Sequence, residues 1–577
     1  MKIINDKKGN KIEELAVFAT DAYKYSHRLL YPEGTEYVYS NMTPRINSYF
    51  RYSYQYTTLG VELFVERFLI KYFNDNFFNL PWKDIEEGYS KVITDGLGRK
   101  VGDIKPIKEL YDLGYLPLEI KALPEGIQVP VGVPMLTIIN TKPEFFWLTN
   151  FIETSLLSEV YPVFNAASIA RQFKKVAKKY SSLTCGDDSH IPWQFHDFSR
   201  RGHHGNDSGL TISLGHLTSF SGTDSVQGAV TAYNYYDAED GVFGSVVASE
   251  HSVASSYGDE EGEFEYYKTL IEDNPEGILS LVSDTYDYYN VLTNILPKLK
   301  QEILSRSGKL VVRPDSGNIE EILSGNHQID ITENTFISDL LKKDTKLNEF
   351  VKCTDTVNKI IADLLKKEMG KGNNILKRLP SSIIKSKEYY YELGYDEEQE
   401  IFIKRIKDIT PEQKGSLRLL WETFGGTVNS KGYKVLDKHI GILYGEGINL
   451  DNIESIMESI KEAGFAVSNV VFGVGAYSYS VFNTRDTFGT AFKTTLVVVN
   501  GEERKVSKHP KGVDFKRSAK GKVAVVEFDG EIKYMDDLSL EDEVNEDMLE
   551  TVFLDGERTR FTKFSTIRER IDQELNK

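Results

Sequence analysis

The segment Ile440-Gly441-Ile442-Leu443-Tyr444-Gly445-Glu446-Gly447 is a short apolar run that ends in a polar loop containing glycine. A helical pattern follows, because apolar residues recur at positions i, i+3, i+4 and i+7: Ile453, Ile456, Met457 and Ile460. Gly464 can end this helix, and a second apolar run at residues 470–472 leads into Gly473-Val474-Gly475. Strand, polar loop, helix and strand in this order predict a parallel α/β fold.

Two earlier segments follow the same plan. Residues 278–282 lead into Ser283-Asp284-Thr285-Tyr286-Asp287, and residues 310–312 lead into Arg313-Pro314-Asp315-Ser316-Gly317-Asn318. In a barrel of parallel strands, the carboxyl ends of the strands converge on the face where active sites are built. One such loop alone would more simply be a surface loop, but four together predict that Asp284, Arg313, Asp315, Gly445 and Gly475 meet in space.

The rest of the chain divides around this pattern. We expect an irregular α/β barrel over residues 161–480 and a second, largely antiparallel β domain. That mixed α+β domain would be built from residues 1–160 with 481–577, and residues 1–50 could pack on the barrel. Residues 320–415 are rich in Lys, Glu, Ile and Leu, and they predict a helical insertion between two barrel strands.

Composition excludes several classes of function. The net charge of -18 over 577 residues argues against a nucleic-acid-binding protein, although a few local cations can still bind a small phosphorylated ligand. Only two cysteines occur, which suits a reducing compartment. The first residues lack an apolar signal core, and no stretch approaches the ~20 apolar residues of a membrane span. We expect a soluble cytoplasmic protein.

Several residues have the chemistry to bind phosphate. Gly473-Val474-Gly475 permits a close backbone approach, but Ser478 replaces the third glycine of a dinucleotide fingerprint, so a simple dinucleotide-binding fold is rejected. A downstream group of basic residues could neutralise phosphates or could form a solvated basic surface: Arg485, Lys493, Lys508, Lys516 and Arg517.

The turn after residues 310–312 places a cation beside a carboxylate. Arg313 can hold phosphate and Asp315 can hold Mg²⁺ directly or through water, unless the two simply pair with each other. A histidine near Asp284, such as His251, could be a nucleophile or a proton carrier. The cluster of His196, His203 and His204 raises a less favoured alternative, a metal site.

Taken in chain order, these segments resemble the nicotinamide phosphoribosyltransferases, which are type II phosphoribosyltransferases. The resemblance covers nearly the whole chain apart from residues 320–415. It is carried by these motifs: Asp21-Ala22-Tyr23-Lys24, Leu116-Pro117-Leu118-Glu119-Ile120-Lys121-Ala122, Trp147-Leu148-Thr149-Asn150, His196-Asp197-Phe198, Gly222-Thr223-Asp224, Glu250-His251-Ser252, Val282-Ser283-Asp284, Val312-Arg313-Pro314-Asp315-Ser316-Gly317-Asn318, Lys431-Gly432-Tyr433-Lys434 and Thr484-Arg485-Asp486.

The resemblance implies a reaction and a set of partners. The phosphoribosyl group of 5-phosphoribosyl 1-pyrophosphate would pass to nicotinamide, giving nicotinamide mononucleotide and pyrophosphate in NAD salvage. Mg²⁺ would be the cofactor and ATP a coupled co-substrate. The protein would be a homodimer with shared active sites.

The resemblance also assigns the base site. Phe198 and Tyr23 would sandwich the nicotinamide ring, with Tyr23 reaching in from the partner subunit. Asp224 would accept from the carboxamide NH₂ and repel the carboxylate of nicotinate. Arg201 and Ser245 would complete the substrate pocket.

For the phosphoribosyl end, the resemblance implies three groups of residues. Arg313 would lie near the ribose phosphate, and Gly445 and Glu446 near the ribose hydroxyls. The phosphate and pyrophosphate region would take Gly475, Arg485, Lys493 and Lys508. His251 would be the residue phosphorylated when ATP is hydrolysed, with Asp284 and Asp315 flanking it and helping to place Mg²⁺.

Some positions depart from the family pattern. Glu446 stands where the family usually has Asp, Ala476 replaces a glycine, and the segment before Arg485 is one residue longer. Two other functions stay open at this point: a nicotinate phosphoribosyltransferase, against which Asp224 argues, and a non-catalytic binding protein on the same scaffold.

Overall fold

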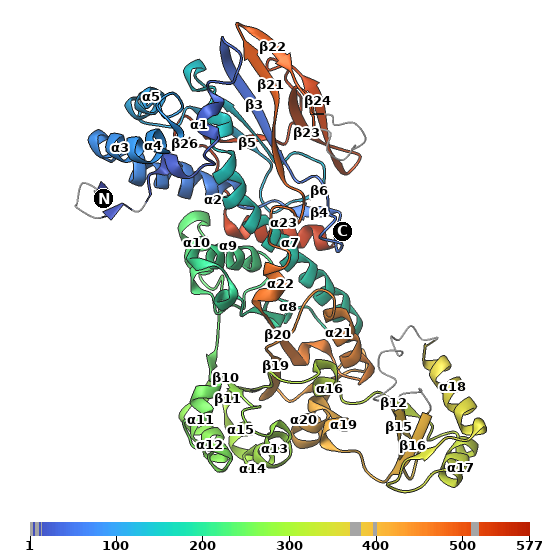
Figure 1. Cartoon of the computed structure of the whole chain (residues 1–577). Coiled ribbons are helices and arrows are strands. Elements are labelled where there is room, and N and C mark those ends of the chain that lie inside the picture. Colours follow the sequence, from blue (N-terminus) through green and yellow to red (C-terminus); the bar gives the residue numbers. More distant parts are fainter. Residues whose placement is uncertain are drawn as a thin grey trace. The chain divides into compact units, whose positions relative to one another are not determined.

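The apolar runs predicted as buried strands form a parallel sheet in the computed structural model of the chain (Figure 1). Leu310 pairs with Ile440, and Ile442 pairs with Val470, so the strand ends carrying the polar loops lie at one edge. The six strands, in spatial order, are β8 (Phe195–Asp197), β20 (Val470–Val474), β19 (Ile440–Tyr444), β11 (Ser307–Arg313), β10 (Glu276–Val282) and β9 (Val247–Ala248). The sheet curls into half of a barrel, which confirms the predicted α/β class.

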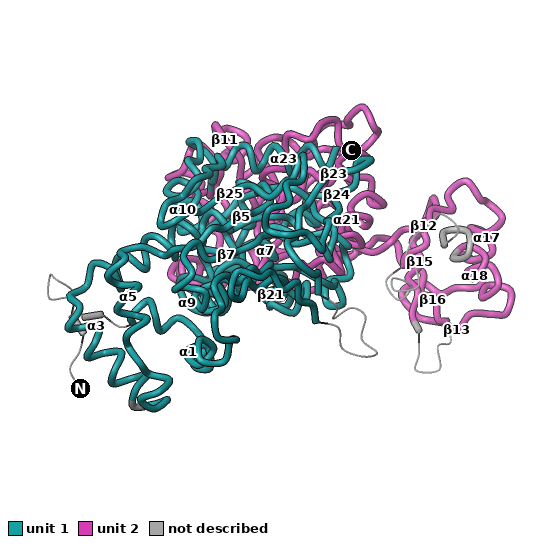
Figure 2. The backbone as a smooth tube through the Cα atoms, turned by 90° about the horizontal axis from the view of Figure 1, so that it is seen from above, with its two compact units in different colours: residues 1–175, 197–244, 476–577 teal, residues 176–196, 245–475 magenta. Residues whose placement is uncertain are grey.

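The structure describes residues 4–5, 11–12, 14–369, 382–395, 401–508 and 518–576. The chain divides into two compact units, coloured separately in Figure 2. Unit 1 holds residues 1–175, 197–244 and 476–577, and unit 2 holds residues 176–196 and 245–475. Among the described helices, none combines the length and the apolarity needed to cross a bilayer.

The predicted helix between the last two barrel strands is confirmed as α21 (Ile453–Glu462). Ile453, Ile456 and Ile460 are fully buried along one face, as their spacing requires. Gly464 follows the helix with φ +82°, a left-handed conformation that glycine adopts without steric cost.

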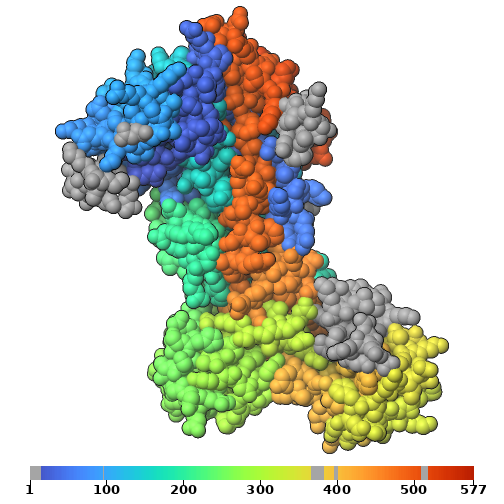
Figure 3. Space-filling view, viewed as in Figure 1, coloured from blue at the N-terminus to red at the C-terminus, as the bar shows by residue number. Residues whose placement is uncertain are grey.

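Unit 1 is built around an antiparallel sheet. Its seven strands are β22 (Glu502–Lys505), β21 (Ala491–Val499), β3 (Thr35–Thr43), β7 (Leu136–Asn140), β5 (Leu118–Ala122), β25 (Glu550–Leu554) and β26 (Glu557–Arg558). Because β21 pairs with β3, a strand from the early part of the chain lies beside a strand from its late part, as the neighbouring blue and orange surfaces in Figure 3 show. The predicted antiparallel character of both chain ends is therefore observed.

The division between the units differs from the predicted domains. Residues 197–244, expected in the barrel, belong to unit 1, where they form α9 (Gly205–Leu217) and α10 (Val226–Tyr236). Gly215 of α9 packs so closely that an added Cβ would lie 2.6 Å from the Cβ of Ala166. Tyr236 of α10 packs its ring against Phe564, with centroids 6.1 Å apart. These long-range contacts leave no local signal in the sequence.

The prediction of a helical insertion over residues 320–415 is wrong. The described part contains a five-stranded sheet: β12 (Gln328–Asp330), β14 (Ile383–Lys385), β15 (Tyr390–Tyr395), β16 (Ile401–Ile406) and β13 (Val351–Lys352). Two helices lie beside it, α17 (Thr335–Asp344) and α18 (Asp355–Met369) (Figure 1). Buried residues of sheet and helices, including Ile384, Leu341 and Ile361, share one hydrophobic core. The insertion therefore has a core of its own.

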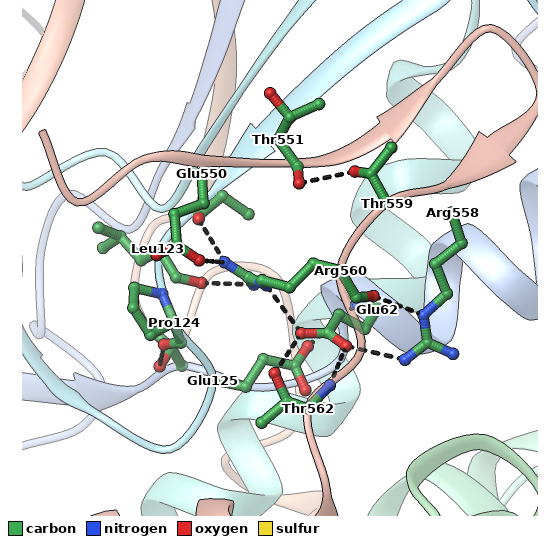
Figure 4. A network of polar contacts seen from close by, with 12 residues as sticks. Glu62, Leu123, Pro124, Glu125, Glu550, Thr551, Arg558, Thr559, Arg560 and Thr562 are labelled. Carbon is green, nitrogen blue, oxygen red and sulfur yellow. Dashed lines mark hydrogen bonds and ion pairs between the residues drawn. The ribbon is translucent and has the colours of Figure 1, made fainter.

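A buried carboxylate ties the end of the chain to its beginning in unit 1 (Figure 4). Glu62 is fully buried, and its Oε1 accepts hydrogen bonds from Arg560 Nε at 2.9 Å and Thr562 Oγ1 at 2.6 Å. Its Oε2 accepts from Arg558 Nη2 at 2.8 Å. Burial raises the pKa of Glu62, but the hydrogen bonds from Thr562 and Arg558 outweigh burial and lower that pKa below its ordinary value.

We expect the Glu62→Ala substitution to reduce the free energy of unfolding by about 3–5 kcal/mol, because Arg558 and Arg560, whose side chains are only 11% and 12% exposed, lose the buried carboxylate that pairs with both. The urea-unfolding midpoint, followed by tryptophan fluorescence, measures this loss. Glu550→Ala is the matched control, because Glu550 also pairs with Arg560 but is 60% exposed, and its loss should cost at most about 1 kcal/mol. Equal midpoint shifts for the two variants would contradict the prediction.

Candidate functional site

Asp197 is a buried carboxylate at the end of β8 that joins two turns of unit 1. Its Oδ1 accepts from the backbone N–H of Ser199 at 2.9 Å, and its Oδ2 accepts from Thr223 Oγ1 at 3.1 Å. Its backbone N–H donates to the Gly222 carbonyl at 3.0 Å, and its carbonyl accepts from Asp224 N–H at 3.1 Å. Residues 197–199 and 222–224 are therefore held together by both side-chain and backbone bonds.

This arrangement positions two of the residues predicted for the base site. Phe198 follows Asp197 directly and is half-buried, and Asp224 is exposed one residue beyond Thr223. A parallel β-bridge between Asp197 and Thr223 fixes the two turns in register. An aromatic face and a carboxylate on neighbouring turns suit a flat ligand that carries a hydrogen-bond donor.

Tyr23 and Arg201 are exposed residues of the same unit. Tyr23 precedes α1 (Lys24–His27), is 59% exposed, and packs edge-on against the His27 ring at 4.8 Å. Arg201 lies in a helical turn three residues after Phe198 and is exposed to solvent. The neighbouring Arg200 is anchored instead, because its Nε donates to Gln227 Oε1 at 2.9 Å.

Unit 1 also gathers a cluster of cations. Burial lowers the pKa of Lys493, and the positive charges of Arg45, Lys508 and Lys24 lower it further, against the opposing effect of Glu153. Burial and the charge of Arg485 likewise lower the pKa of Arg45. Cations that depress one another's pKa values in this way concentrate positive charge, which would favour a polyanion. The cluster comprises Lys24, which also pairs with Glu153, and Arg45, Arg485, Lys493 and Lys508. Lys516 and Arg517 lie outside the described residues.

Arg45 was missed in the sequence analysis. It lies in Thr43-Pro44-Arg45-Ile46, which matches no phosphate-binding pattern. It reaches the cluster because it follows β3 directly, and β3 pairs with β21, the strand that carries Lys493. The position of Arg45 next to Lys493 becomes apparent only from the pairing of β3 with β21.

In unit 2, the loops after β10 and β11 bring two carboxylates together. The Asp315 N–H donates to Asp284 Oδ2 at 3.0 Å, and Arg313 Nε lies 3.5 Å from Asp315 Oδ2. Arg313 is also held by a hydrogen bond from Nη2 to the Ser249 carbonyl at 2.8 Å. Oδ1 of both Asp284 and Asp315 is buried without a hydrogen-bond partner in the described structure. Buried polar oxygens without a partner are common at sites that bind a polar ligand or a cation.

His251 lies beside this pair at the start of α11 (His251–Ser255). Its Nε2 is 3.8 Å from Asp284 Oδ1, and its Nδ1 is 3.0 Å from Thr285 Oγ1. The side chain is 53% exposed, so the ring is oriented by its neighbours and still accessible. The predicted grouping of His251, Asp284, Arg313 and Asp315 is observed.

The donor set fits Mg²⁺. Burial raises the pKa of Asp315, Arg313 lowers it and the Asp284 charge raises it again, so that the pKa of Asp315 lies above its ordinary value. Among the described residues, no three His, Cys, Asp or Glu side chains converge on one point as a metal cage. Mg²⁺ commonly takes one or two carboxylates and completes its shell with phosphates and water, so the pair Asp284 and Asp315 is compatible with this ion.

Gly445 leaves the space that Asp315 occupies. A Cβ at Gly445 would lie 2.3 Å from Asp315 Oδ1, which is closer than any real contact of this kind. Glu446 is exposed at the next position, and Gly475 follows β20 at the same edge of the sheet. Ser245 is exposed, and it is the first residue of the second segment of unit 2, residues 245–475.

The alternative metal site gains no support. His203 Nδ1 is 3.1 Å from Ser480 Oγ, and burial lowers the pKa of His203. His196 is buried and His204 is exposed. The part of the chain that the structure describes contains no metal-binding group that includes them.

Sequence comparison gives a consistent result. The family profile "Nicotinate phosphoribosyltransferase (NAPRTase) family" matches residues 193–366 and 410–557. Nicotinamide phosphoribosyltransferase of Acinetobacter baylyi is 37% identical over 569 residues, which cover 96% of this chain and 97% of that protein. Nicotinamide phosphoribosyltransferase of Mycoplasma pneumoniae is 30% identical over 511 residues, which cover 86% and 92% of the two chains.

A solved structure supports the fold. The crystal structure of nicotinate-nucleotide pyrophosphorylase from Pyrococcus furiosus superposes with a TM-score of 0.50 at 15% identity, covering 98% of this chain and 97% of that one. The profile match and the full-length relatives together show that the chain belongs to the nicotinate phosphoribosyltransferase family.

Proposed function

We propose that the chain transfers the phosphoribosyl group of 5-phosphoribosyl 1-pyrophosphate to nicotinamide, giving nicotinamide mononucleotide and pyrophosphate. The observation that carries this proposal is the exposed Asp224 carboxylate held on the turn beside Phe198. The names of the relatives from Acinetobacter baylyi and Mycoplasma pneumoniae support it.

The carboxylate decides between the two bases. Nicotinamide offers an NH₂ group, which can donate to Asp224, whereas nicotinate offers a second negative charge, which Asp224 repels. A hydrogen bond to a charged acceptor contributes about 1.5–3 kcal/mol, roughly a ten- to hundredfold preference. A nicotinate phosphoribosyltransferase activity, which the family name would suggest, is therefore the less favoured alternative.

The transfer is largely a matter of positioning. As the C1–O bond to pyrophosphate breaks, the electron pair leaves with the pyrophosphate and the pyridine nitrogen forms the new bond to C1. Phe198, with Tyr23 as the second face, would fix the ring in the attacking orientation. Arg313 and the cations around Lys493 would bind the phosphates and stabilise the leaving group's charge. A bound Mg²⁺ on Asp284 and Asp315 would add Lewis-acid stabilisation of phosphate oxygens.

His251 is the proposed site of coupling to ATP. Thr285 holds Nδ1 and the Asp284 carboxylate lies near Nε2, so the ring is oriented for reaction while its edge stays in solvent. Transfer of the γ-phosphoryl group of ATP to a ring nitrogen would release ADP, and the phosphohistidine would improve binding of the phosphoribosyl donor. We also propose a cytoplasmic homodimer in which the exposed Tyr23 serves the partner's base site.

The proposal predicts that purified protein with phosphoribosyl pyrophosphate and Mg²⁺ converts nicotinamide to its mononucleotide in preference to nicotinate. Asp224→Ala should lower kcat/KM for nicotinamide about ten- to hundredfold and leave nicotinate turnover unchanged or higher, because both the acceptor and the repulsion are lost. The measurement is product formation by chromatography with each base, with and without ATP.

Asp240→Ala is the control, because Asp240 is an exposed carboxylate in the loop after α10. The selectivity of Asp240→Ala between nicotinamide and nicotinate should equal that of the parent protein. A parent that prefers nicotinate would overturn the amide assignment, and one that forms no nucleotide would favour a non-catalytic binding protein. A folded Asp224→Ala protein with unchanged selectivity would refute the role of Asp224.

A second prediction concerns Gly445. Gly445→Ala should displace the Asp315 carboxylate and lower kcat/KM at least tenfold, with a higher Mg²⁺ concentration needed for half-maximal activity. Gly186→Ala is the control, because a Cβ there meets no atom within 4 Å. An unchanged Mg²⁺ requirement in Gly445→Ala would contradict the placement of Mg²⁺ at Asp315.

A further inference from the structure

His216 of α9 is a fully buried histidine that the proposed mechanism does not use, and it bridges two parts of unit 1. Its Nδ1 lies 2.6 Å from the hydroxyl of Tyr479, and its Nε2 lies 2.9 Å from the carbonyl of Gly222. Gly222 begins the turn that carries Asp224, and Tyr479 lies on α22 (Ala476–Ser480), which follows Gly475 in the chain. Gly222 and Tyr479, the two hydrogen-bond partners of the ring, therefore both belong to segments next to the candidate base site.

The chemistry of the two partners fixes the tautomer of the neutral ring. A carbonyl oxygen can only accept, so Nε2 must carry the proton and donate to Gly222. In the neutral imidazole, Nδ1 is then the acceptor, and the Tyr479 hydroxyl donates to it. Burial raises the pKa of Tyr479 well above its ordinary value, so the hydroxyl keeps its proton. The order of donors therefore runs from Tyr479 through His216 to the Gly222 carbonyl.

The Gly222 carbonyl receives two hydrogen bonds, one from His216 and one from Asp197 N–H at 3.0 Å. A carbonyl oxygen has two lone pairs, so both are occupied and the orientation of this peptide group is fixed. Thr223 and Asp224 follow directly. Any rotation of the Gly222 peptide would move the Asp224 backbone that donates to Asp197.

Helix α22 also contacts the other turn of the base site. A Cβ at Gly202 would lie 2.2 Å from the Cβ of Ala476, so the helix rests directly against the turn that follows Phe198. His203 Nδ1, one residue further, is 3.1 Å from Ser480 Oγ. Ala476 stands where the family pattern has glycine, and here its methyl group fills the space that Gly202 leaves.

We infer that Tyr479 and His216 are positioning residues for base recognition, which brace the turn carrying Asp224 through the Gly222 carbonyl and so set the selectivity between the amide and the acid. The inference rests on the proposed function, and it adds to Asp224 two residues that do not touch the base. Helix α22 would then support the base site, in addition to following the glycine-containing loop that ends at Gly475 and is expected to bind phosphate.

The test compares Tyr479→Phe with Tyr477→Phe. Tyr479→Phe removes only the buried donor, and we expect the nicotinamide-to-nicotinate ratio of kcat/KM to fall about tenfold, through a higher KM for the base, with kcat and the KM for phosphoribosyl pyrophosphate within about twofold of the parent. Tyr477→Phe removes a hydroxyl from the same helix, but Tyr477 is 70% exposed, so no change is expected.

His216 supplies a second pair of variants. His216→Gln retains an N–H that can donate to Gly222 and an oxygen that can accept from Tyr479, so it should retain most of the selectivity. His216→Leu loses both bonds and should lose selectivity at least as far as Tyr479→Phe. Recovery by Gln and not by Leu separates a positioning role from a purely structural one.

The outcomes distinguish the two claims. A parent protein that prefers nicotinate would overturn the proposed function, and the change of the base ratio in Tyr479→Phe would still test the brace. An active parent with an unchanged ratio in Tyr479→Phe would overturn the inference and leave the proposed function standing. Equal loss in His216→Gln and His216→Leu would also overturn it.

Discussion

The candidate base site depends on the hydrogen bonds that surround the buried carboxylate of Asp197. A charge in a fully buried position is tolerated only when donors surround it, and here the donors are Ser199 and Thr223. Those donors belong to the two turns that present Phe198 and Asp224. The need to satisfy one charge therefore holds together an aromatic face and a carboxylate that lie 26 positions apart along the chain.

At the candidate site, buried polar side chains whose hydrogen bonds are complete have a different role from those with an unpaired polar atom. The side chains of Asp197 and His216 are buried and fixed by hydrogen bonds on both sides, which suits residues that position others. Asp284 and Asp315 each have a buried oxygen without a hydrogen bond, and His251 is half-exposed, which suits residues that meet ligands.

Sequence reasoning succeeded where the signal was local. The helix at Ile453–Glu462 and the strands around it follow from periodicity and glycine placement. It failed in the insertion, because strands such as Ile401–Ile406 (Ile-Phe-Ile-Lys-Arg-Ile) show no regular apolar–polar alternation and lie within a Lys- and Glu-rich segment that also contains true helices. Arg45, and the roles of His216 and Tyr479, depend on packing between distant segments, so no local pattern could reveal them.

We propose that Asp224, held on the turn next to that of Phe198 by Asp197, recognises the carboxamide of nicotinamide. A crystal structure of the protein with bound nicotinamide would test this recognition. We expect the pyridine ring stacked on Phe198 and the amide nitrogen about 2.7–3.1 Å from an Asp224 carboxylate oxygen. Nicotinamide bound away from Phe198, or with its amide directed away from Asp224, would contradict it.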